Sequence, residues 1–275
     1  MATSPVTTTR RGAVLDIVLD RPPVNAINGP VTQALYGAFK ALQDDSDLRV
    51  GTITGTGTRV FSAGWDLKEV AAQTSIVETD AATASPGGFA GIVEFWGLKK
   101  PVIAAVNGIA VGGGFEIALA CDVIVASETA EFFLPEMQRG FLPDAGAIQR
   151  LPRRIPFNVA MEMMLSGRRM PASEAKHWGL VHEVVPSDRL HAYVAELADR
   201  IAEGAPLALQ ALKEALGAMM HVSLPEAFAI TKRAIAAQGN GSSGLPVYER
   251  MLTSEDFFEG PRAFVEKRKP NFKGR

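Results

Sequence analysis

Glu116 is the side chain that most strongly indicates acid/base chemistry in this 275-residue chain. It directly follows Gly112-Gly-Gly-Phe115 and lies at the start of an apolar stretch that reaches Cys121. Because an ionised carboxylate is costly to bury, a glutamate in an apolar helix is expected to have a raised pKa, which suits it to donate and accept protons near neutral pH. The structural alternative is a carboxylate that backbone N–H groups satisfy, and the sequence alone leaves both interpretations open.

Two further acidic residues follow Glu116 along the chain. Glu136 comes after Leu134-Pro135 at an expected helix start, where the helix dipole stabilises a carboxylate in any case. Asp144 lies in Phe141-Leu-Pro-Asp-Ala-Gly-Ala147, which is typical of a turn or an N-cap. Local structure is enough to explain either residue when it is considered alone.

Two glycine-containing turns could offer backbone N–H groups to a negatively charged oxygen. The first is Phe61-Ser-Ala-Gly-Trp-Asp-Leu-Lys-Glu69, and the second is Asn107-Gly-Ile-Ala-Val-Gly-Gly-Gly-Phe-Glu116. Each is expected to lead into the N-terminus of a helix, where unpaired N–H groups and the positive end of the dipole lie. Glycine also lacks the Cβ atom that would keep a ligand oxygen at a distance. If the two turns face each other they can form an oxyanion hole; otherwise they are ordinary turns.

The sequence lacks the residues that several other chemistries need. It contains no phosphate-binding P-loop, no Gly-x-Ser-x-Gly nucleophile elbow and no complete dinucleotide fingerprint. The four histidines are scattered without ligand spacing, so we expect no metal site. The single cysteine, Cys121, lies in an apolar run and is expected to be a buried small side chain rather than a nucleophile. It cannot form an internal disulfide, which fits a reducing compartment.

The elements that would position these residues follow from hydrophobic periodicity and from turn residues. We expect strands over residues 13–20, 50–54, 102–106, 123–126 and 181–185. We expect helices over residues 30–43, with Asn28 as the N-cap, and over 115–121, 156–166, 187–202, 205–219 and 223–238. Strands and helices therefore alternate in the first half, and the part after about residue 153 is mostly helical. This pattern predicts an α/β fold.

Composition and charge are those of an ordinary globular protein. Hydrophobic residues make up 47% of the chain and charged residues 21%, so a large core can form without disulfides. With 28 Lys and Arg against 30 Asp and Glu, the net charge is −2, and we expect no nucleic-acid partner. The apolar run 101–120 is not expected to span a membrane, because Glu116 would be costly in lipid. The first residues contain no apolar signal segment, which together with Cys121 predicts a cytoplasmic protein.

Eight short motifs occur in a specific order along the chain. They are Arg21-Pro-Pro-Val-Asn25, Phe61-Ser-Ala-Gly-Trp-Asp-Leu-Lys68, Pro101-Val-Ile-Ala-Ala-Val-Asn-Gly108, Gly112-Gly-Gly-Phe-Glu116, Leu134-Pro-Glu136, Gly140-Phe-Leu-Pro143, Gln149-Arg-Leu151 and Phe264-Val-Glu-Lys-Arg268. This order resembles the crotonase (enoyl-CoA hydratase/isomerase) superfamily over nearly the whole chain. Four segments resemble the carnitinyl-CoA dehydratase (crotonobetainyl-CoA hydratase) subfamily more closely: Ala63-Gly-Trp-Asp-Leu-Lys68, Pro86-Gly-Gly-Phe-Ala-Gly91, Glu259-Gly-Pro261 and Phe272-Lys-Gly-Arg275.

The resemblance implies a ββα-spiral core with a helical C-terminal region that forms homotrimers, often paired as a dimer of trimers. It implies an acyl-CoA-binding catalytic core over residues 1–195, and a region for oligomerisation and coenzyme A contact over residues 196–275. The implied substrate is an acyl-CoA thioester. No metal and no separate cofactor are implied, because coenzyme A is part of the substrate, and no nucleic-acid or membrane partner is implied.

The resemblance also implies roles for individual residues. The oxyanion donors would be the backbone N–H groups of Trp65 and Gly113, and the acid/base carboxyl groups would be Glu116 and Glu136. Asp144 stands where simple hydratases have glycine and some family isomerases have a carboxylate, so it could act as an acid, a base or a substrate contact. Coenzyme A contacts are expected at Ala63, Asp66, Lys68, Phe264 and Lys267, of which the last two would reach the coenzyme A of a neighbouring subunit.

The resulting hypothesis is a hydro-lyase that adds water to, or removes water from, the 2,3 double bond of an acyl-CoA. Trp65 stands where many hydratases have a small residue and should reshape the pocket. If the acyl group carries a trimethylammonium group, Trp65, Phe89 and Trp96 are candidates for a cation-binding aromatic wall; otherwise they line an apolar pocket. Other functions stay open: isomerisation or thioester hydrolysis on the same scaffold, RNA binding by a crotonase homologue, or a non-catalytic partner.

Overall fold

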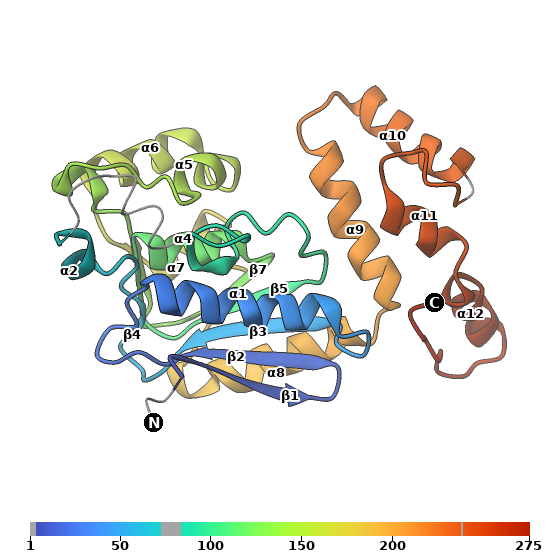
Figure 1. The fold of residues 1–275 in the computed structure, drawn as a ribbon, viewed down its shortest axis with the longest axis horizontal. Coiled ribbons are helices and arrows are strands. Elements are labelled where there is room, and N and C mark those ends of the chain that lie inside the picture. Colours follow the sequence, from blue (N-terminus) through green and yellow to red (C-terminus); the bar gives the residue numbers. More distant parts are fainter. Residues whose placement is uncertain (1–3, 73–83, 238) are drawn as a thin grey trace.

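The computed structural model describes residues 4–72, 84–237 and 239–275, and two sheets organise the first part of the chain (Figure 1). The strands are β1 (Val6–Arg11), β2 (Val14–Leu19), β3 (Val50–Gly55), β4 (Val60–Ser62), β5 (Val102–Val106), β6 (Ile109–Val111), β7 (Val123–Ser127), β8 (Glu131–Phe133), β9 (Met170–Pro171) and β10 (Glu183–Val185). The larger sheet has the order β1-β2-β3-β5-β7-β10 and is parallel except for the β1–β2 pair. The smaller sheet has the order β4-β6-β8-β9 and is parallel except for the β8–β9 pair.

Helices cover both faces of the larger sheet and make up most of the C-terminal part. The α-helices are α1 (Gly29–Asp44), α2 (Leu67–Val70), α4 (Gly113–Ala120), α5 (Ala147–Arg150), α6 (Phe157–Ser166), α7 (Ala172–His177), α8 (Leu190–Ala202), α9 (Pro206–Met219), α10 (Leu224–Ala237), α11 (Pro246–Leu252) and α12 (Glu255–Val265). The 3-10 helices are η1 (Phe89–Gly91), η2 (Glu136–Arg139), η3 (Leu151–Arg153) and η4 (Ser187–Arg189).

The two faces of the larger sheet bury different sets of side chains. On β5, Val102, Ala104 and Val106 belong to the main core with α1, whereas Ile103 and Ala105 belong to a second core with α8. Successive side chains of a strand point to opposite faces, so a strand that is covered on both sides reads as a continuous apolar run. Full burial of each valine or isoleucine stabilises the fold by about 1.5–3 kcal/mol.

Helix α1 begins where the sequence predicts. The Asn28 side chain accepts a hydrogen bond of 3.2 Å from Val31 N–H, and Pro30 occupies the first turn. Leu35 and Phe39, one turn apart, are fully buried against the sheet. Capping and one apolar face therefore fix both the start and the orientation of this helix.

Helix α4 is buried on all sides. It follows β6 of the smaller sheet and precedes β7 of the larger one, and every residue from Gly113 to Leu119 is buried. The Phe115 ring packs against Phe132 of β8, with ring centroids 5.2 Å apart. A charged side chain on this helix therefore has no solvent-facing side to occupy, which sets Glu116 apart from ordinary helical glutamates.

The α/β first half and the helical C-terminal part match the prediction. The expected strands over 50–54, 102–106 and 123–126 correspond to β3, β5 and β7, and the late strand shortens to β10. The sequence prediction missed β1 and the whole smaller sheet. The first glycine turn leads only to the four-residue helix α2, and Glu136 starts a 3-10 turn rather than an α-helix.

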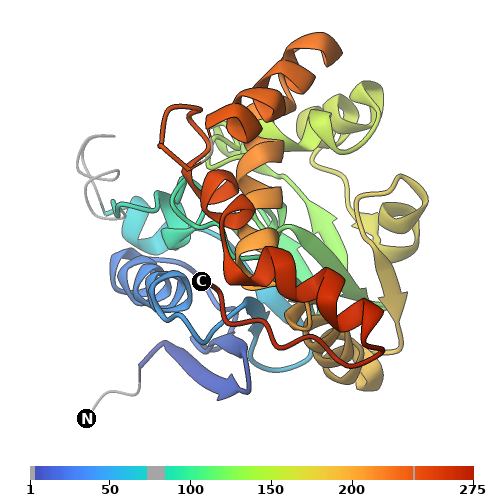
Figure 2. The same cartoon turned by 90° about the vertical axis from the view of Figure 1, so that its right-hand side faces the viewer.

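Beyond α8 the chain leaves the larger sheet, and α9 to α12 form an arm beside it (Figures 1 and 2). This arm has a small core of its own around Ala215, Ala234 and Leu245. The C-terminal tail returns to the sheet region, where Arg49 Nη2 donates to the Phe272 carbonyl at 2.8 Å. The predicted division between residues 195 and 196 falls within α8 and stays a prediction. Among the residues that the structure describes, no helix is long and apolar enough to cross a membrane.

Candidate active site

The ends of β4 and β6 bring the two glycine turns into contact. These strands are parallel neighbours, so the turns that follow them leave the same edge of the smaller sheet. Gly64 has φ +73°, and a Cβ atom there would lie 2.6 Å from Gly113 N and 2.7 Å from Val111 O. The two main chains therefore touch directly, and position 64 has room only for glycine.

Two backbone amides at this junction have no acceptor within the described ranges. Ile27 bridges the first turn, because its N–H group donates to Gly64 O at 2.7 Å and its carbonyl accepts from Asp66 N–H at 2.9 Å. Trp65 lies between Gly64 and Asp66, and its N–H group takes no part in this bridge. Gly113 is the first residue of α4, so its N–H group has no carbonyl one turn earlier. Amides of this kind can bind a negatively charged oxygen.

Glu116 brings a carboxyl group into the buried helix that starts at this junction. The residue is 3% exposed, and its Oε1 accepts a hydrogen bond of 2.9 Å from Ala147 N–H. Burial raises the pKa of Glu116 to about 8; the Ala147 N–H group and the Arg150 cation lower it, whereas Glu136 and Asp144 raise it. A single backbone hydrogen bond does not offset the burial, so Glu116 is mostly protonated near neutral pH.

Glu136 lies over the start of the same helix. It is buried, and its Oε2 has no hydrogen-bond partner among the described residues. A Cβ atom on Gly112 would lie 2.5 Å from Glu136 Oε1. The Glu136 carboxyl group therefore packs directly against Gly112, next to Gly113, where any larger residue would displace it. Burial raises the pKa of Glu136 to about 7, and the charge of Asp144 raises it as well, while Arg139 lowers it. Two carboxyl groups with pKa values near neutrality beside unpaired amides can transfer protons at a polarised carbonyl group.

Aromatic rings flank the junction. The Trp65 and Phe141 rings meet edge to face, with centroids 6.2 Å apart. The Phe89 ring lies against the second turn, since a Cβ atom on Gly113 would be 2.6 Å from Phe89 Cε1. Trp96, the third aromatic candidate, is 73% exposed and has no such contact in the part of the chain that is described. The structure therefore supports an aromatic surface of Trp65, Phe89 and Phe141.

The other predicted residues of the first turn make local contacts that hold it in place. Ala63 N–H donates to Val24 O at 2.9 Å. Asp66 accepts from Lys68 N–H at 3.2 Å and forms an ion pair of 2.7 Å with Arg21. Although partial burial opposes the shift, the hydrogen bond from Arg21 lowers the pKa of Asp66. The Lys68 side chain is exposed, and coenzyme A contact by these three residues stays a prediction.

Asp144 is an exposed residue in the turn that leads into α5. Its charge contributes to the raised pKa values of both Glu116 and Glu136. The turn matches the prediction, but the alternative of an N-cap is wrong, because Gly146 precedes α5 and no side chain caps that helix. Asp144 therefore acts on the site through its charge in this structure.

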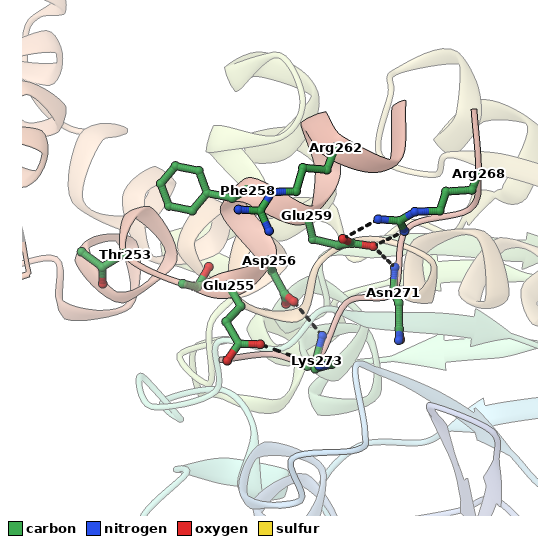
Figure 3. Close-up of a pocket in the computed structure, with 10 residues that line it drawn as sticks. Thr253, Glu255, Asp256, Phe258, Glu259, Arg262, Arg268, Asn271 and Lys273 are labelled. Atoms are coloured by element: carbon green, nitrogen blue, oxygen red, sulfur yellow. Dashed lines mark hydrogen bonds and ion pairs between the residues drawn. The ribbon is translucent and has the colours of Figure 1, made fainter. Parts of the chain in front are cut away.

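Phe264 is in the last turn of α12 and Lys267 follows that helix. Helix α12 belongs to the arm and lies away from α4 (Figure 1). Phe264 is 85% exposed. A cavity of about 570 Å³ in this region is lined mainly by polar and charged side chains, several of which pair with one another (Figure 3). Glu259 binds Arg268 Nη2 at 2.9 Å and accepts from Asn271 N–H at 2.8 Å. Contact of Phe264 and Lys267 with coenzyme A would need a neighbouring subunit and stays a prediction.

Known proteins match this chain along nearly its whole length. The family model for enoyl-CoA hydratase/isomerase matches residues 9–275. The chain belongs to the enoyl-CoA hydratase/isomerase family. The carnitinyl-CoA dehydratases of Proteus mirabilis and Salmonella typhi are 47% and 46% identical over 267 residues, which is 97% of this chain and 97% of each relative.

Solved enoyl-CoA hydratase structures share its fold. The enzyme from Mycobacterium tuberculosis H37Rv superposes with a TM-score of 0.86 at 34% identity, covering 99% of this chain and 100% of that chain. The enzyme from Bacillus anthracis gives a TM-score of 0.86 at 33% identity, covering 98% and 100%. The predicted family and fold class are confirmed, and the relatives support the predicted hydratase/dehydratase class of enzyme.

Sequence reasoning missed three residues that this structure places at the candidate site. Arg150 belongs to one of the motifs that carry the resemblance, yet a single arginine does not reveal that it lies beside a buried carboxyl group. Ala147 acts through its N–H group, which no side-chain pattern indicates. Phe141 lies in the same turn as Asp144 and offered no signal of its own.

Glu116→Gln is expected to make the free energy of unfolding less sensitive to alkaline pH. The pKa of Glu116 rises from 4.5 to about 8 on folding, so the folded state binds more protons between these values. The stability that depends on protonated Glu116 is therefore fully present below the unfolded pKa of 4.5. It is lost as the pH rises through the folded pKa of about 8. Glutamine removes this loss. Calorimetry should show the variant melting at least about 2–4 °C higher than the unchanged chain at about pH 9, with a smaller difference at about pH 5. An equal difference at both pH values would contradict the raised pKa.

Proposed function

We propose that this chain adds water to, or removes water from, the 2,3 double bond of an acyl-CoA thioester whose acyl group carries a trimethylammonium group, as in crotonobetainyl-CoA and carnitinyl-CoA. The observation that carries the reaction is a pair of buried glutamates, with pKa values of about 8 and 7, beside two amides without acceptors in the described residues. The names of the relatives, carnitinyl-CoA dehydratases, support the substrate class.

In this proposal the thioester oxygen accepts hydrogen bonds from the N–H groups of Trp65 and Gly113. Negative charge develops on that oxygen as water adds at Cβ, and one donor of this kind is worth about 2.7–4 kcal/mol in the transition state. The direct contact between Gly64 and Gly113 supports this role, because it holds the two donors on adjacent turns.

Glu116 and Glu136 would hold one proton between them near neutral pH and titrate as a pair. The carboxylate accepts a proton from water as the water oxygen bonds to Cβ, and the carboxyl group donates its proton to Cα. The pair again holds one proton at the end, and dehydration is the same sequence reversed. Coenzyme A is the carrier part of the substrate, and this scheme uses no separate cofactor.

A hydration assay that compares crotonobetainyl-CoA with crotonyl-CoA tests the proposal. We expect loss of the conjugated enoyl thioester absorbance with both substrates, and a higher kcat/KM for crotonobetainyl-CoA. A 3-enoyl-CoA measures isomerisation, and a thiol reagent measures thioester hydrolysis. Inactivity in hydration, or faster turnover in either of these two reactions, would contradict the proposal.

Phe141→Leu is expected to reduce discrimination in favour of the cationic acyl group. An aromatic face attracts a quaternary ammonium ion by about 0.5–2 kcal/mol, so kcat/KM for crotonobetainyl-CoA should fall about 2- to 30-fold more than kcat/KM for crotonyl-CoA. Phe157→Leu changes an exposed ring on α6 and serves as the control. Equal losses for the two substrates would indicate that Phe141 lines an apolar pocket instead.

We also propose a homotrimer, alone or as a dimer of trimers, built through the arm in which α9 to α12 lie. Large apolar side chains that stay exposed on α9, at its C-cap and on α10 support this, because exposed apolar surface marks interfaces. They are Leu212, Leu216, Met220, Leu224 and Phe228. Light scattering should give the mass of three or six chains, and a monomer would contradict the proposal. The buried single cysteine supports a cytoplasmic location.

A further inference from the structure

Arg150 is a half-buried arginine at the end of α5, one turn after the residue that binds Glu116. Its Nη2 donates to the Val93 carbonyl at 2.5 Å. Its Nη1 fills the space where a side chain on Gly146 would lie. The guanidinium group therefore covers the start of α5 and fastens it to the segment that follows η1.

The start of α5 is also where Glu116 is held. Ala147 N–H donates to Glu116 Oε1 at 2.9 Å, and Arg150 N–H donates to Gly146 O at 2.9 Å. Arg150 thus closes the same helical turn whose amide binds the carboxyl group. Its acceptor, Val93, lies one turn beyond Phe89, since Val93 N–H donates to Phe89 O at 3.4 Å.

No carboxylate of the described residues forms an ion pair with this arginine, although burial of an unpaired cation is costly. Burial and the neighbouring cation of Arg154 lower the pKa of Arg150, whereas Glu116, Cys121 and Glu94 raise it. Glu116 is the largest of the acidic contributions.

We propose that Arg150 is a positioning residue for Glu116. The Arg150 side chain holds the start of α5 in place, and its positive charge stabilises the ionised form of the buried Glu116 carboxyl group. This inference rests on the proposed function and deepens it, because it assigns a residue that sets which glutamate of the pair holds the proton. The groups that face Glu116 are Glu136, Asp144, the Ala147 N–H group and Arg150. Of these, Arg150 is the cation, so its loss favours the protonated form of Glu116.

Arg154 provides a matched control in the same region. It is also half-buried, it lies one turn later, and its Nη2 donates to a single carbonyl group, Cys121 O, at 2.7 Å. Burial lowers its pKa, Cys121 and Asp122 oppose this shift, and Glu116 is not among its causes. Replacing Arg154 therefore removes a comparable half-buried cation that is not among the groups acting on Glu116.

The test compares Arg150→Met, Arg150→Lys and Arg154→Met. Arg150→Met should lower kcat by about 10-fold or more, with a smaller change in KM, and move the alkaline limb of the kcat profile to higher pH. Arg150→Lys keeps the positive charge but loses the guanidinium hydrogen bond to the Val93 carbonyl. It should therefore lower kcat without moving the alkaline limb of the pH profile. Arg154→Met should lower the melting temperature and leave both kcat and the limb unchanged. An unshifted limb in Arg150→Met, or the same shift in Arg154→Met, would overturn the proposal.

Infrared titration separates this inference from the proposed function, because it needs no substrate. The carboxyl band that Glu116→Gln removes should disappear at higher pH in Arg150→Met than in the unchanged chain. If the chain hydrates no enoyl-CoA but this band shifts, the proposed function fails and the role of Arg150 holds. If hydration is measured and the band does not shift, the role of Arg150 is overturned.

Discussion

Glu136→Gln is expected to lower kcat for enoyl-CoA hydration by about 10²–10⁴-fold while the chain stays folded, because general acid/base groups contribute rate factors of this size. The Glu136 carboxyl group is buried, has a pKa of about 7 and keeps one oxygen without a partner in the described part of the chain. Glutamine keeps the shape of the side chain but can neither accept nor donate the transferred proton. Stopped assays at high enzyme concentration, with circular dichroism as a check of folding, measure the effect.

Glu131→Gln is the matched control for this prediction. Glu131 lies five positions earlier in the sequence, and its carboxylate pairs with Arg169 at 2.7 Å near the surface. Such pairs contribute about 0–1 kcal/mol, so the control should keep both its activity and its stability. Near-normal hydration by Glu136→Gln would remove Glu136 from the mechanism, and an equal loss in Glu131→Gln would indicate a general effect on the fold.

The larger sheet could be predicted because burial on both faces leaves long apolar runs. Val102–Val106 on β5 is the clearest example. The smaller sheet could not, because β4, β6 and β8 have three residues each, too few to show a period. β1 was missed for a different reason: its residues are mostly exposed threonine and arginine, and pairing with β2 holds them in a strand.

The candidate site shows the same division between local and long-range information. Glu116 could be recognised because its own helix is apolar, which is a local property. The burial of Glu136 could not, because the 3-10 turn that it opens is polar and its surroundings come from the start of α4, more than twenty positions earlier. The contribution of Arg150 likewise depends on Val93 and Glu116, which are distant in sequence.

The raised pKa values of the two glutamates and the free amide of Gly113 have one physical origin. Gly113 and Glu116 lie in the first turn of α4, and Glu136 of η2 lies beside that turn. Helix α4 packs against β4, β6 and α5, and its residues from Gly113 to Leu119 are buried from water. Exclusion of water raises the cost of ionising either carboxyl group, and it also strengthens any hydrogen bond from the amides to a ligand oxygen. The acid/base pair and the oxyanion donors therefore depend on the same packing, and a change that separates the two turns should weaken both.

Gly64→Ala is the substitution that tests this dependence. Its Cβ atom would lie 2.6 Å from Gly113 N, 2.7 Å from Val111 O and 3.0 Å from Gly114 N. All three are backbone atoms, which cannot rotate away as a side chain can, so the two turns must move apart. Because loss of one oxyanion donor typically costs about 10²–10³-fold in kcat, we expect a loss of at least this size with crotonyl-CoA.

Gly57→Ala separates the effect of the clash from the effect of backbone strain. Gly57 has φ +79°, close to the +73° of Gly64, but a Cβ atom there meets nothing within 4 Å. Both variants introduce alanine into the left-handed region, where it is disfavoured by roughly 1–2 kcal/mol, and both should melt earlier for that reason. Only Gly64→Ala should lose hydration, because only it displaces Gly113. A folded Gly64→Ala chain with unchanged kcat would show that the thioester oxygen is not held between these two turns.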